Sequence, residues 1–247
     1  MPRLPEDYRE RFYRRQATAG RLISFRVQVR QSDLYIRAQR DLSEAARHSL
    51  IQHRAKLESY TAVHPGFLDS LIPLPPDPLA PPLVQEMLAA GRAARVGPMA
   101  AVAGAIAQAV GRDLLEFSAE VVVENGGDIW LHTPSECTVA IFAGASPLSN
   151  RVGLRVEPAL SPLAICTSSA TVGHSLSLGK ADAAVAVAPS GALADAAATA
   201  IGNAVSGPRA LQAGLEAARG IEGLLGAVVI CGERLGAWGE AVELVRL

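Results

Sequence analysis

The sequence predicts an α+β fold in which layers of mixed or antiparallel sheet pack with helices. Near the start of the chain, Phe25, Val27 and Val29 alternate with polar residues, which is the period of a half-buried strand. The last stretch, 226–247, has the pattern of a hairpin. Alanine-rich segments with helical spacing lie between these ends. Hairpins at both ends favour layered sheets over a doubly wound parallel sheet.

The individual elements follow from local patterns. Residues 21–39 predict two strands joined at residues 31–33, and the six prolines within 71–83 exclude a helix or a central strand there. We expect a basic arm or helix at 1–20 and a single domain over 21–247. Helices are predicted at 42–60, 82–95, 98–117, 193–203 and 208–218, and further strands near 119–124, 128–133, 137–142, 163–167 and 182–188.

Composition narrows the class of protein. The 247 residues are 49% hydrophobic with a net charge of −1, which predicts a sizeable core. Residues 1–60 hold 13 Lys and Arg against 7 Asp and Glu, while residues 61–247 hold 10 against 17. No aromatic platform accompanies the arginines, so we expect no nucleic-acid partner. The three cysteines are far apart, and no 18-residue apolar run exists, so we expect a cytoplasmic protein without a membrane partner.

The first candidate site is the turn Asn125-Gly126. Asn-Gly between strand-like runs is a strong hairpin signal, because both turn residues must tolerate a positive φ. A plain hairpin needs neither Gly127 nor Asp128. The second glycine removes a side chain where a backbone could lie against a ligand, with Asp128 at the rim. A double glycine is weak evidence by itself.

The second candidate is a loop rich in hydroxyl groups. Its hydroxyls and backbone amides suit phosphate oxygens, although ordinary turns have the same composition. His174 is a candidate general base or phosphate contact, but a single histidine in a loop more often has neither role. The residues concerned are Thr167, Ser168, Ser169, Thr171, Gly173 and His174.

The third candidate is the helix that Ser190 is expected to cap. Asp195 and Thr199 are spaced i, i+4 and therefore share one face of it. A carboxylate and a hydroxyl so placed are oxygen ligands suited to Mg²⁺. The alternative is structural, because an acid near a helix start favours the helix dipole and a threonine can be filler.

Together these motifs resemble the ApbE family, whose members are Mg²⁺-dependent, FAD-hydrolysing flavin transferases that move FMN onto a Thr or Ser of a target protein. The chain looks closest to a short, uncharacterised branch of that superfamily. The motifs are Asn125-Gly126-Gly127-Asp128-Ile129, Thr167-Ser168, and Ala194-Asp195-Ala196-Ala197-Ala198-Thr199-Ala200.

The resemblance implies residue roles. Asp195 and Thr199 would hold the metal with a backbone carbonyl near Ala101, because Pro98-Met99-Ala100-Ala101-Val102-Ala103-Gly104 resembles the family's D-L-G-x-I-A-K-G helix start. Gly126 and Gly127 would line a ligand groove. His174 and Asp195 are the catalytic candidates.

One departure limits the implied activity. In the family the threonine-serine segment leads to H-x-x-D-P-x-T-G, whereas His174 here is followed by Ser175-Leu176-Ser177-Leu178-Gly179-Lys180. We therefore expect a protein that binds Mg²⁺ and FAD or a related nucleotide, without efficient flavin transfer. Cleavage of the pyrophosphate of this ligand stays open. A non-catalytic scaffold for a ligand or protein, an enzyme of another cofactor's biosynthesis, and a homo-oligomer all stay open.

Overall fold

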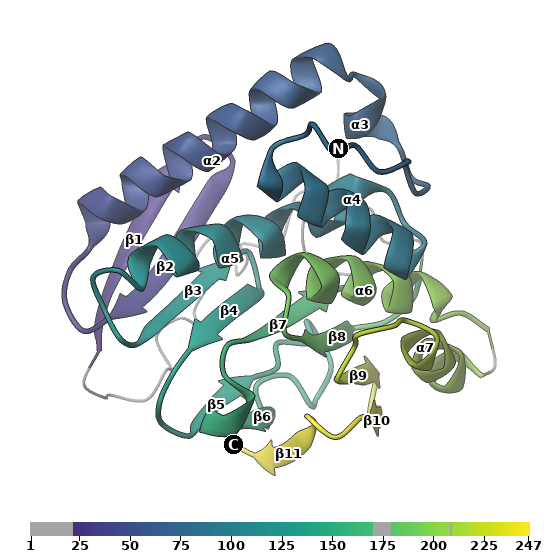
Figure 1. Cartoon of the computed structure of the whole chain (residues 1–247). Coiled ribbons are helices and arrows are strands. Elements are labelled where there is room, and N and C mark those ends of the chain that lie inside the picture. Colours follow the sequence, from purple (N-terminus) through teal and green to yellow (C-terminus); the bar gives the residue numbers. More distant parts are fainter. Residues whose placement is uncertain (1–21, 170–178, 208) are drawn as a thin grey trace.

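The computed structural model describes residues 22–169, 179–207 and 209–247, which form two antiparallel sheets and a layer of helices (Figure 1). The large sheet has eight strands in the order β1-β2-β3-β4-β7-β8-β9-β10. These strands are β1 (Ile23–Val29), β2 (Ser32–Ala38), β3 (Val121–Asn125), β4 (Asp128–His132), β7 (Leu163–Ser168), β8 (Ala183–Ala188), β9 (Gly226–Cys231) and β10 (Arg234–Trp238). The small sheet contains β11 (Glu243–Arg246), β6 (Val152–Val156) and β5 (Cys137–Ala140), in that order.

Helices cover one face of the large sheet, and the small sheet covers the other (Figure 1). In particular, α5 packs on β3 and β4, and α6 packs on β7 and β8. The helices are α2 (Ser43–Val63), α3 (Gly66–Asp69), α4 (Pro82–Ala94), α5 (Val102–Leu114), α6 (Gly191–Ala204) and α7 (Ala210–Arg219), with 3₁₀ turns η2 (Pro98–Ala101) and η3 (Pro158–Leu160). The predicted α+β class with layered antiparallel sheets is confirmed.

Strand alternation divides the buried side chains between two cores. On β8, Ala184 and Ala186 face the helices, while Val185 and Val187 face the small sheet. The small alanines on the helix side let the alanine-rich α6 lie close to the sheet. This division decides on which side of the sheet each candidate site residue lies.

Several predicted boundaries were wrong. The first hairpin turns at Arg30 and Gln31, not at 31–33, because Arg30 takes a positive φ of 52° and so closes a two-residue turn. The helix expected over 98–117 begins as η2 and ends at Leu114. The C-terminal stretch is not one hairpin: β9 pairs with β10, and β11 leaves to pair with β6. The strand β6 was not predicted.

Other predictions concern the ends of the chain and the membrane. The expected arm at 1–20 lies outside the described residues, so the domain boundary stays a prediction. Within the described ranges, no single helix is long and apolar enough to cross a membrane. One pair reaches that length and composition only when combined, Pro82–Ala94 with Pro98–Leu114, and it is bent by 106° at the break.

Candidate functional site

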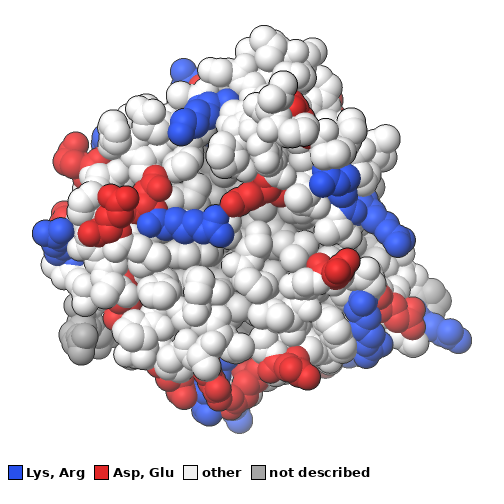
Figure 2. Space-filling model, in the orientation of Figure 1, with Lys and Arg blue, Asp and Glu red and all other residues white. Residues whose placement is uncertain are grey.

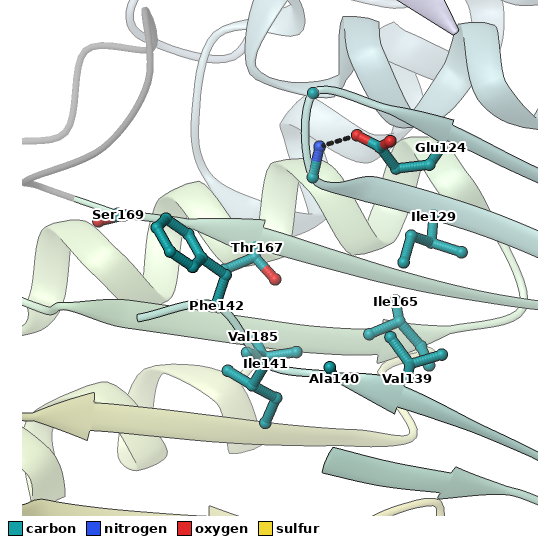
Figure 3. A pocket seen from close by; sticks show the side chains of 12 residues that line it. Glu124, Ile129, Val139, Ala140, Ile141, Phe142, Ile165, Thr167, Ser169 and Val185 are labelled. Carbon is teal, nitrogen blue, oxygen red and sulfur yellow. Dashed lines mark hydrogen bonds between the residues drawn. The ribbon is translucent and has the colours of Figure 1, made fainter. Parts of the chain in front are cut away.

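The turn between β3 and β4 is a two-residue hairpin turn built by Gly126 and Gly127. Their φ values are +71° and +108°, so both positions need glycine for conformational reasons. The turn was expected at Asn125-Gly126, but Asn125 pairs with Asp128 as the last residue of β3, so the turn lies one residue further along and Gly127 is needed by the hairpin itself. Glu124 fixes the turn, because its Oε1 accepts a hydrogen bond of 2.9 Å from the Gly127 amide (Figure 3). A Cβ at either glycine would meet nothing within 4 Å, so the turn faces open space.

The residues that flank this turn face the helices. Asn125 and Asp128 pair across the hairpin, and both are buried. The Asn125 side-chain amide donates to the Ala103 carbonyl at the start of α5 over 3.0 Å. Asp128 Oδ1 accepts a hydrogen bond of 3.2 Å from the Thr167 amide on β7. The turn, the end of β7 and the start of α5 therefore meet in space.

Asp195 reaches the same place from the first turns of α6. Its Oδ2 accepts hydrogen bonds from the amides of Ala103 and Gly104, at 3.0 and 2.9 Å. The first amides of a helix have no partner within the helix, and they carry the positive end of its dipole. A carboxylate from a neighbouring helix therefore caps α5, in a role that sequence spacing did not predict.

The crossing of α5 and α6 is set by two glycines. A Cβ on Gly104 would lie 2.2 Å from the Gly191 carbonyl oxygen, and one on Gly191 would lie 2.3 Å from that of Gly104. Gln108, which is fully buried, accepts a hydrogen bond of 2.7 Å from the Gly191 amide and donates one of 2.6 Å to Glu86. The contact between the two backbones and the hydrogen bonds of Gln108 thus fix the start of α6, and with it the position of Asp195.

The electrostatics of the site follow from burial. Burial raises the pKa of Asp128 to about 7, although the hydrogen bond from the Thr167 amide acts in the opposite direction. Burial and then the nearby charge of Asp128 raise the pKa of the half-buried Asp195, against hydrogen bonds from Gly104 and Ala103. Burial, and then the charges of Asp128 and Asp195, likewise raise the pKa of the Cys166 thiol. The two carboxyls therefore do not both carry a free negative charge. Either one of them keeps a proton, or a cation balances the charge.

The donor atoms at this place fit a hard cation. Among the described residues, no Lys or Arg forms an ion pair with Asp128 or Asp195. Thr199 is half-buried one turn beyond Asp195, and Ala101 lies in η2, which packs against α6. These residues offer carboxylate, hydroxyl and carbonyl oxygens, the ligands that Mg²⁺ takes. The described ranges contain no cluster of three His, Cys, Asp or Glu arranged for a metal, so such a site would need the other oxygens.

The remaining predicted ligand residues divide between the two faces. Ser168 follows Cys166 by two positions and so shares the helix side with it. Thr167 and Ser169 instead line a cavity of about 80 Å³ between the two sheets, together with Gly126 and Gly127 (Figure 3). Its other walls are mostly apolar: Ile129, Val139, Ala140, Ile141, Phe142, Ile165 and Val185, with Glu124 at the turn.

The size of this cavity limits what it can enclose. An engineered cavity that holds benzene has a volume of roughly 150 Å³, so this one is too small to enclose a flavin ring system. The hydroxyls of Thr167 and Ser169 therefore border a space suited to waters or a small substituent. The sequence motif that looked continuous is divided by strand alternation.

Two predicted residues cannot be placed, and two residues of the site were not predicted from the sequence. His174 and Thr171 lie outside the described residues. Sequence reasoning missed Cys166, which precedes the threonine-serine motif by one residue. It also missed Gln108, although a single polar residue within an apolar helix face was a usable signal. The roles assigned to the site residues stay predictions.

Comparison with known proteins gives the family. The family model described as "AbpE bacteria" matches residues 14–234. The UPF0280 protein of Methanococcus aeolicus is 37% identical, over 91% of this chain and 93% of that protein. The UPF0280 protein of Methanosarcina acetivorans is 41% identical, over 82% of this chain and 81% of that protein.

Solved structures give the fold. A mutant of the flavin transferase ApbE from Vibrio cholerae matches with a TM-score of 0.58 at 10% identity, covering 90% of this chain and 98% of that chain. The apo flavinyl transferase ApbE from Pseudomonas stutzeri matches with a TM-score of 0.52 at 13% identity, covering 89% and 95%. At such identities the likeness is one of fold. With the match over most of its length, the chain belongs to the family described as AbpE bacteria and has the ApbE fold.

Proposed function

We propose that this protein binds Mg²⁺ together with a flavin- or nucleotide-type phosphorylated small molecule. The observation that carries the proposal is the pair Asp128 and Asp195, which come from opposite sides of the sheet–helix interface. Burial raises the pKa of both, and the charge of Asp128 adds to the shift at Asp195. One buried and one half-buried carboxyl, without a basic partner among the described residues, favour a bound cation.

The metal ligands we propose are Asp195, Thr199 and the carbonyl of Ala101. Asp195 Oδ2 already accepts two amide hydrogen bonds, so its Oδ1 is the oxygen we assign to the cation. The charge of Asp128 acts on Asp195, and we therefore assign Asp128 a place beside the metal, bound directly or through a water. Mg²⁺ usually keeps several waters and accepts phosphate oxygens, which suits a site with few protein ligands.

The class of the organic ligand rests on the fold. The two structural neighbours are named flavin and flavinyl transferases, which supports a flavin nucleotide as the first ligand to test. We place its phosphates beside the turn Asn125–Asp128 and Ser168. The cavity lined by Thr167 and Ser169 is too small for the ring system, so the rings would lie outside it.

The chemistry we propose is cleavage of a pyrophosphate or tight binding without turnover. When bound, Mg²⁺ would neutralise phosphate charge and act as a Lewis acid. Asp195 lies on α6 and is held by hydrogen bonds from the first amides of α5, and in this position it would orient the cation. Asp128, whose pKa burial raises to about 7, could hold or release a proton at the reacting phosphate. The missing D-P-x-T-G segment favours the second candidate, a ligand-binding scaffold without flavin transfer.

Thermal unfolding of the metal-stripped protein tests the proposal. FAD, FMN, ADP and AMP are each added with and without Mg²⁺, and product formation is followed by chromatography. A ligand at about 100 times its Kd stabilises the fold by about 2.7 kcal/mol. We expect a shift that requires Mg²⁺ and is lost in Asp195→Asn and weakened in Thr199→Val.

The matched control is Asp113→Asn. Asp113 lies on α5, ten residues or about 15 Å beyond Ala103, and accepts hydrogen bonds from Ser49 and His53, far from the end of the helix that Asp195 caps. It should keep the full Mg²⁺-dependent shift. The proposed site is contradicted if the Mg²⁺-dependent shift persists in Asp195→Asn. It is also contradicted if none of the nucleotides shifts the melting temperature. A thermal shift without any reaction product would favour the ligand-binding scaffold. Rapid flavinylation of a threonine peptide would contradict our expectation that flavin transfer is not efficient.

A further inference from the structure

The proline-rich stretch between α3 and α4 has no role in the candidate site. We call residues 71–79 the proline segment, since four of these nine residues are prolines. Within it the chain forms neither helix nor strand, and it joins the two helices at the outside of the molecule (Figure 1). Its prolines are Pro73, Pro75, Pro76 and Pro78.

Proline chemistry restricts this segment to an extended backbone. A proline ring fixes its own φ at about −65° and disfavours the helical region for the residue before it. Ser70, before the segment, has φ −66° and ψ 124°, and Pro81, after it, has φ −52° and ψ 148°. A polyproline II helix has φ of about −75° and ψ of about 145°. The conformations at both ends and the prolines between them therefore favour a polyproline II path.

The exposure of the side chains follows the three-residue period of that helix. Leu74 and Asp77 are partly buried, whereas Pro73, Pro75 and Pro76 are exposed. A polyproline II helix has three residues per turn, so residues three positions apart share a row. One row thus faces the protein, and two rows face outward.

The inward row anchors the segment. Leu74 packs against the core on the helix side of the large sheet. The Tyr60 hydroxyl donates to Asp77 Oδ2 over 2.9 Å, and Asp77 Oδ1 accepts a hydrogen bond of 2.9 Å from the Leu79 amide. The outward rows are therefore held in one conformation before a partner arrives, which lowers the entropy lost on binding.

The outward rows offer a partner apolar rings and carbonyl groups. The side chains that flank them are strongly exposed, Ile72 at 70% and Leu79 at 95%. In the part of the chain that the structure describes, no group donates a hydrogen bond to the carbonyls of residues 73–76. These carbonyls are acceptors that a partner can use.

Charge narrows the class of partner. From residue 62 to residue 81 the chain has two acidic residues, Asp69 and Asp77, and no Lys or Arg. The surface around α3 is mostly free of charged side chains in Figure 2. A nucleic acid or an anionic membrane surface would require basic residues, and prolines lack the amide hydrogens that extend a partner's sheet. The partner that fits is a protein with basic groups beside its contact surface.

We propose that the proline segment is a docking site for a partner protein whose groove is lined by aromatic side chains and flanked by basic ones. Grooves lined by aromatic side chains recognise polyproline II helices, because flat rings pack against the prolines and the helix is already ordered. A groove that grips two rows leaves the third facing away, and here that third row is the one bound to the protein. The inference does not depend on the proposed magnesium and nucleotide site.

Nuclear magnetic resonance titration with isolated binding modules tests the proposal. Three ¹⁵N-labelled modules, of the SH3, WW and EVH1 types, are each chosen for basic residues beside the aromatic groove and are titrated with the unlabelled full chain. We expect at least one of them to bind through its groove with a Kd of about 1 mM or tighter. The test variant combines Pro73→Ala and Pro76→Ala, which removes one outward row, and it should weaken binding about 10-fold or more.

The matched control is Pro82→Ala, which replaces an exposed proline outside the segment, in the first turn of α4. It should bind as the wild type does, because alanine is a good helix former at this position. A second variant, Pro76→Lys, changes a single exposed side chain and sets a positive charge against the basic flank, so it should also lose binding. Unchanged melting temperatures show that the variants fold.

The proposal is overturned if none of the three modules binds the wild-type chain, or if the double variant binds as tightly as the wild type does. Sedimentation velocity of the chain alone supplies the second measurement. A dimer that dissociates in the double variant would mean that a second copy covers the segment, and it would overturn the proposal as well. Binding that the double variant loses and Pro82→Ala keeps supports the proposal, provided that the double variant leaves the oligomeric state unchanged.

Discussion

Replacing Asp128 with asparagine should change how the stability of the protein depends on pH. Burial raises the pKa of Asp128 to about 7 in the folded state, whereas an aspartate in an unfolded chain has a pKa of about 3.9. Below the unfolded value the carboxyl is protonated in both states, and its burial carries no ionisation penalty. As the pH rises, the unfolded chain releases this proton first, so the free energy of unfolding falls until the folded pKa is passed.

The size of the effect follows from the difference between the two pKa values. A difference of about 3 units corresponds to about 4 kcal/mol over the whole range, and about 2–3 kcal/mol of it falls between about pH 5 and pH 8. Asparagine keeps an oxygen that accepts from the Thr167 amide but does not ionise. Relative to wild type, the free energy of unfolding of Asp128→Asn should therefore gain about 2–3 kcal/mol between these pH values.

Thermal unfolding in EDTA, repeated across this pH range, measures the difference. For a chain of this size each kcal/mol moves the Tm by roughly 2–4 °C, so the gap between variant and wild type should widen by about 5–10 °C. Saturating Mg²⁺ should shrink the gap, because a cation stabilises the ionised carboxyl. Parallel curves for the two proteins in EDTA would refute the reasoning, since Asp128 would then titrate alike in both states.

Three further substitutions test the supports of the site by urea unfolding. Gly104→Ala places a Cβ against the Gly191 carbonyl oxygen and should lower the free energy of unfolding by about 1–3 kcal/mol, whereas Gly66→Ala, with nothing within 4 Å, should not. Gln108→Leu removes the acceptor of the Gly191 amide and should cost about 1–3 kcal/mol; a neutral result would mean that another group binds this amide. Ser190→Ala removes the cap of α6 and should cost about 0.5–2 kcal/mol, and no loss would show that the cap is dispensable.

Local rules predicted the features that depend on local geometry. A hairpin turn was predicted at Asn125-Gly126; the hairpin forms between β3 and β4, with its turn one residue further along, at Gly126-Gly127. Ser190 was predicted to cap a helix, and its Oγ accepts from the Leu193 amide. In both cases the residues that determine the conformation lie within four positions of one another. The class of the fold followed from the same signals.

Long-range pairing could not be predicted in this way. The strand β6 is five residues long and pairs with β11, so that Val152 meets Arg246. No turn links the two, and the partner comes from the far end of the chain. The same limit applied to the site. The amides that donate to Asp195 belong to Ala103 and Gly104, which lie 92 and 91 positions before it in the sequence.

The candidate site shows a second reason why the sequence alone could not predict the arrangement of its residues. Thr167, Ser168 and Ser169 form one motif in the sequence, but neighbouring strand residues point to opposite faces. Only Ser168 shares the side of Asp128, and its neighbours line the cavity between the sheets. The alternation along β7 predicts which of these residues share a face of the sheet. It does not predict which face is covered by the helices. That choice depends on how the whole sheet is covered.

The contact between Gly104 and Gly191 has a consequence for how this protein can diverge. The separation of α5 and α6 is set by main-chain atoms, which every sequence supplies, and by two positions that admit no larger residue. Substitutions elsewhere on either helix alter its surface without changing that separation. A carboxylate mounted beside such a contact keeps its placement while most of the surrounding residues are exchanged. Lineages of this kind can therefore drift far in sequence, and can acquire new ligands, around an anchor whose position stays fixed.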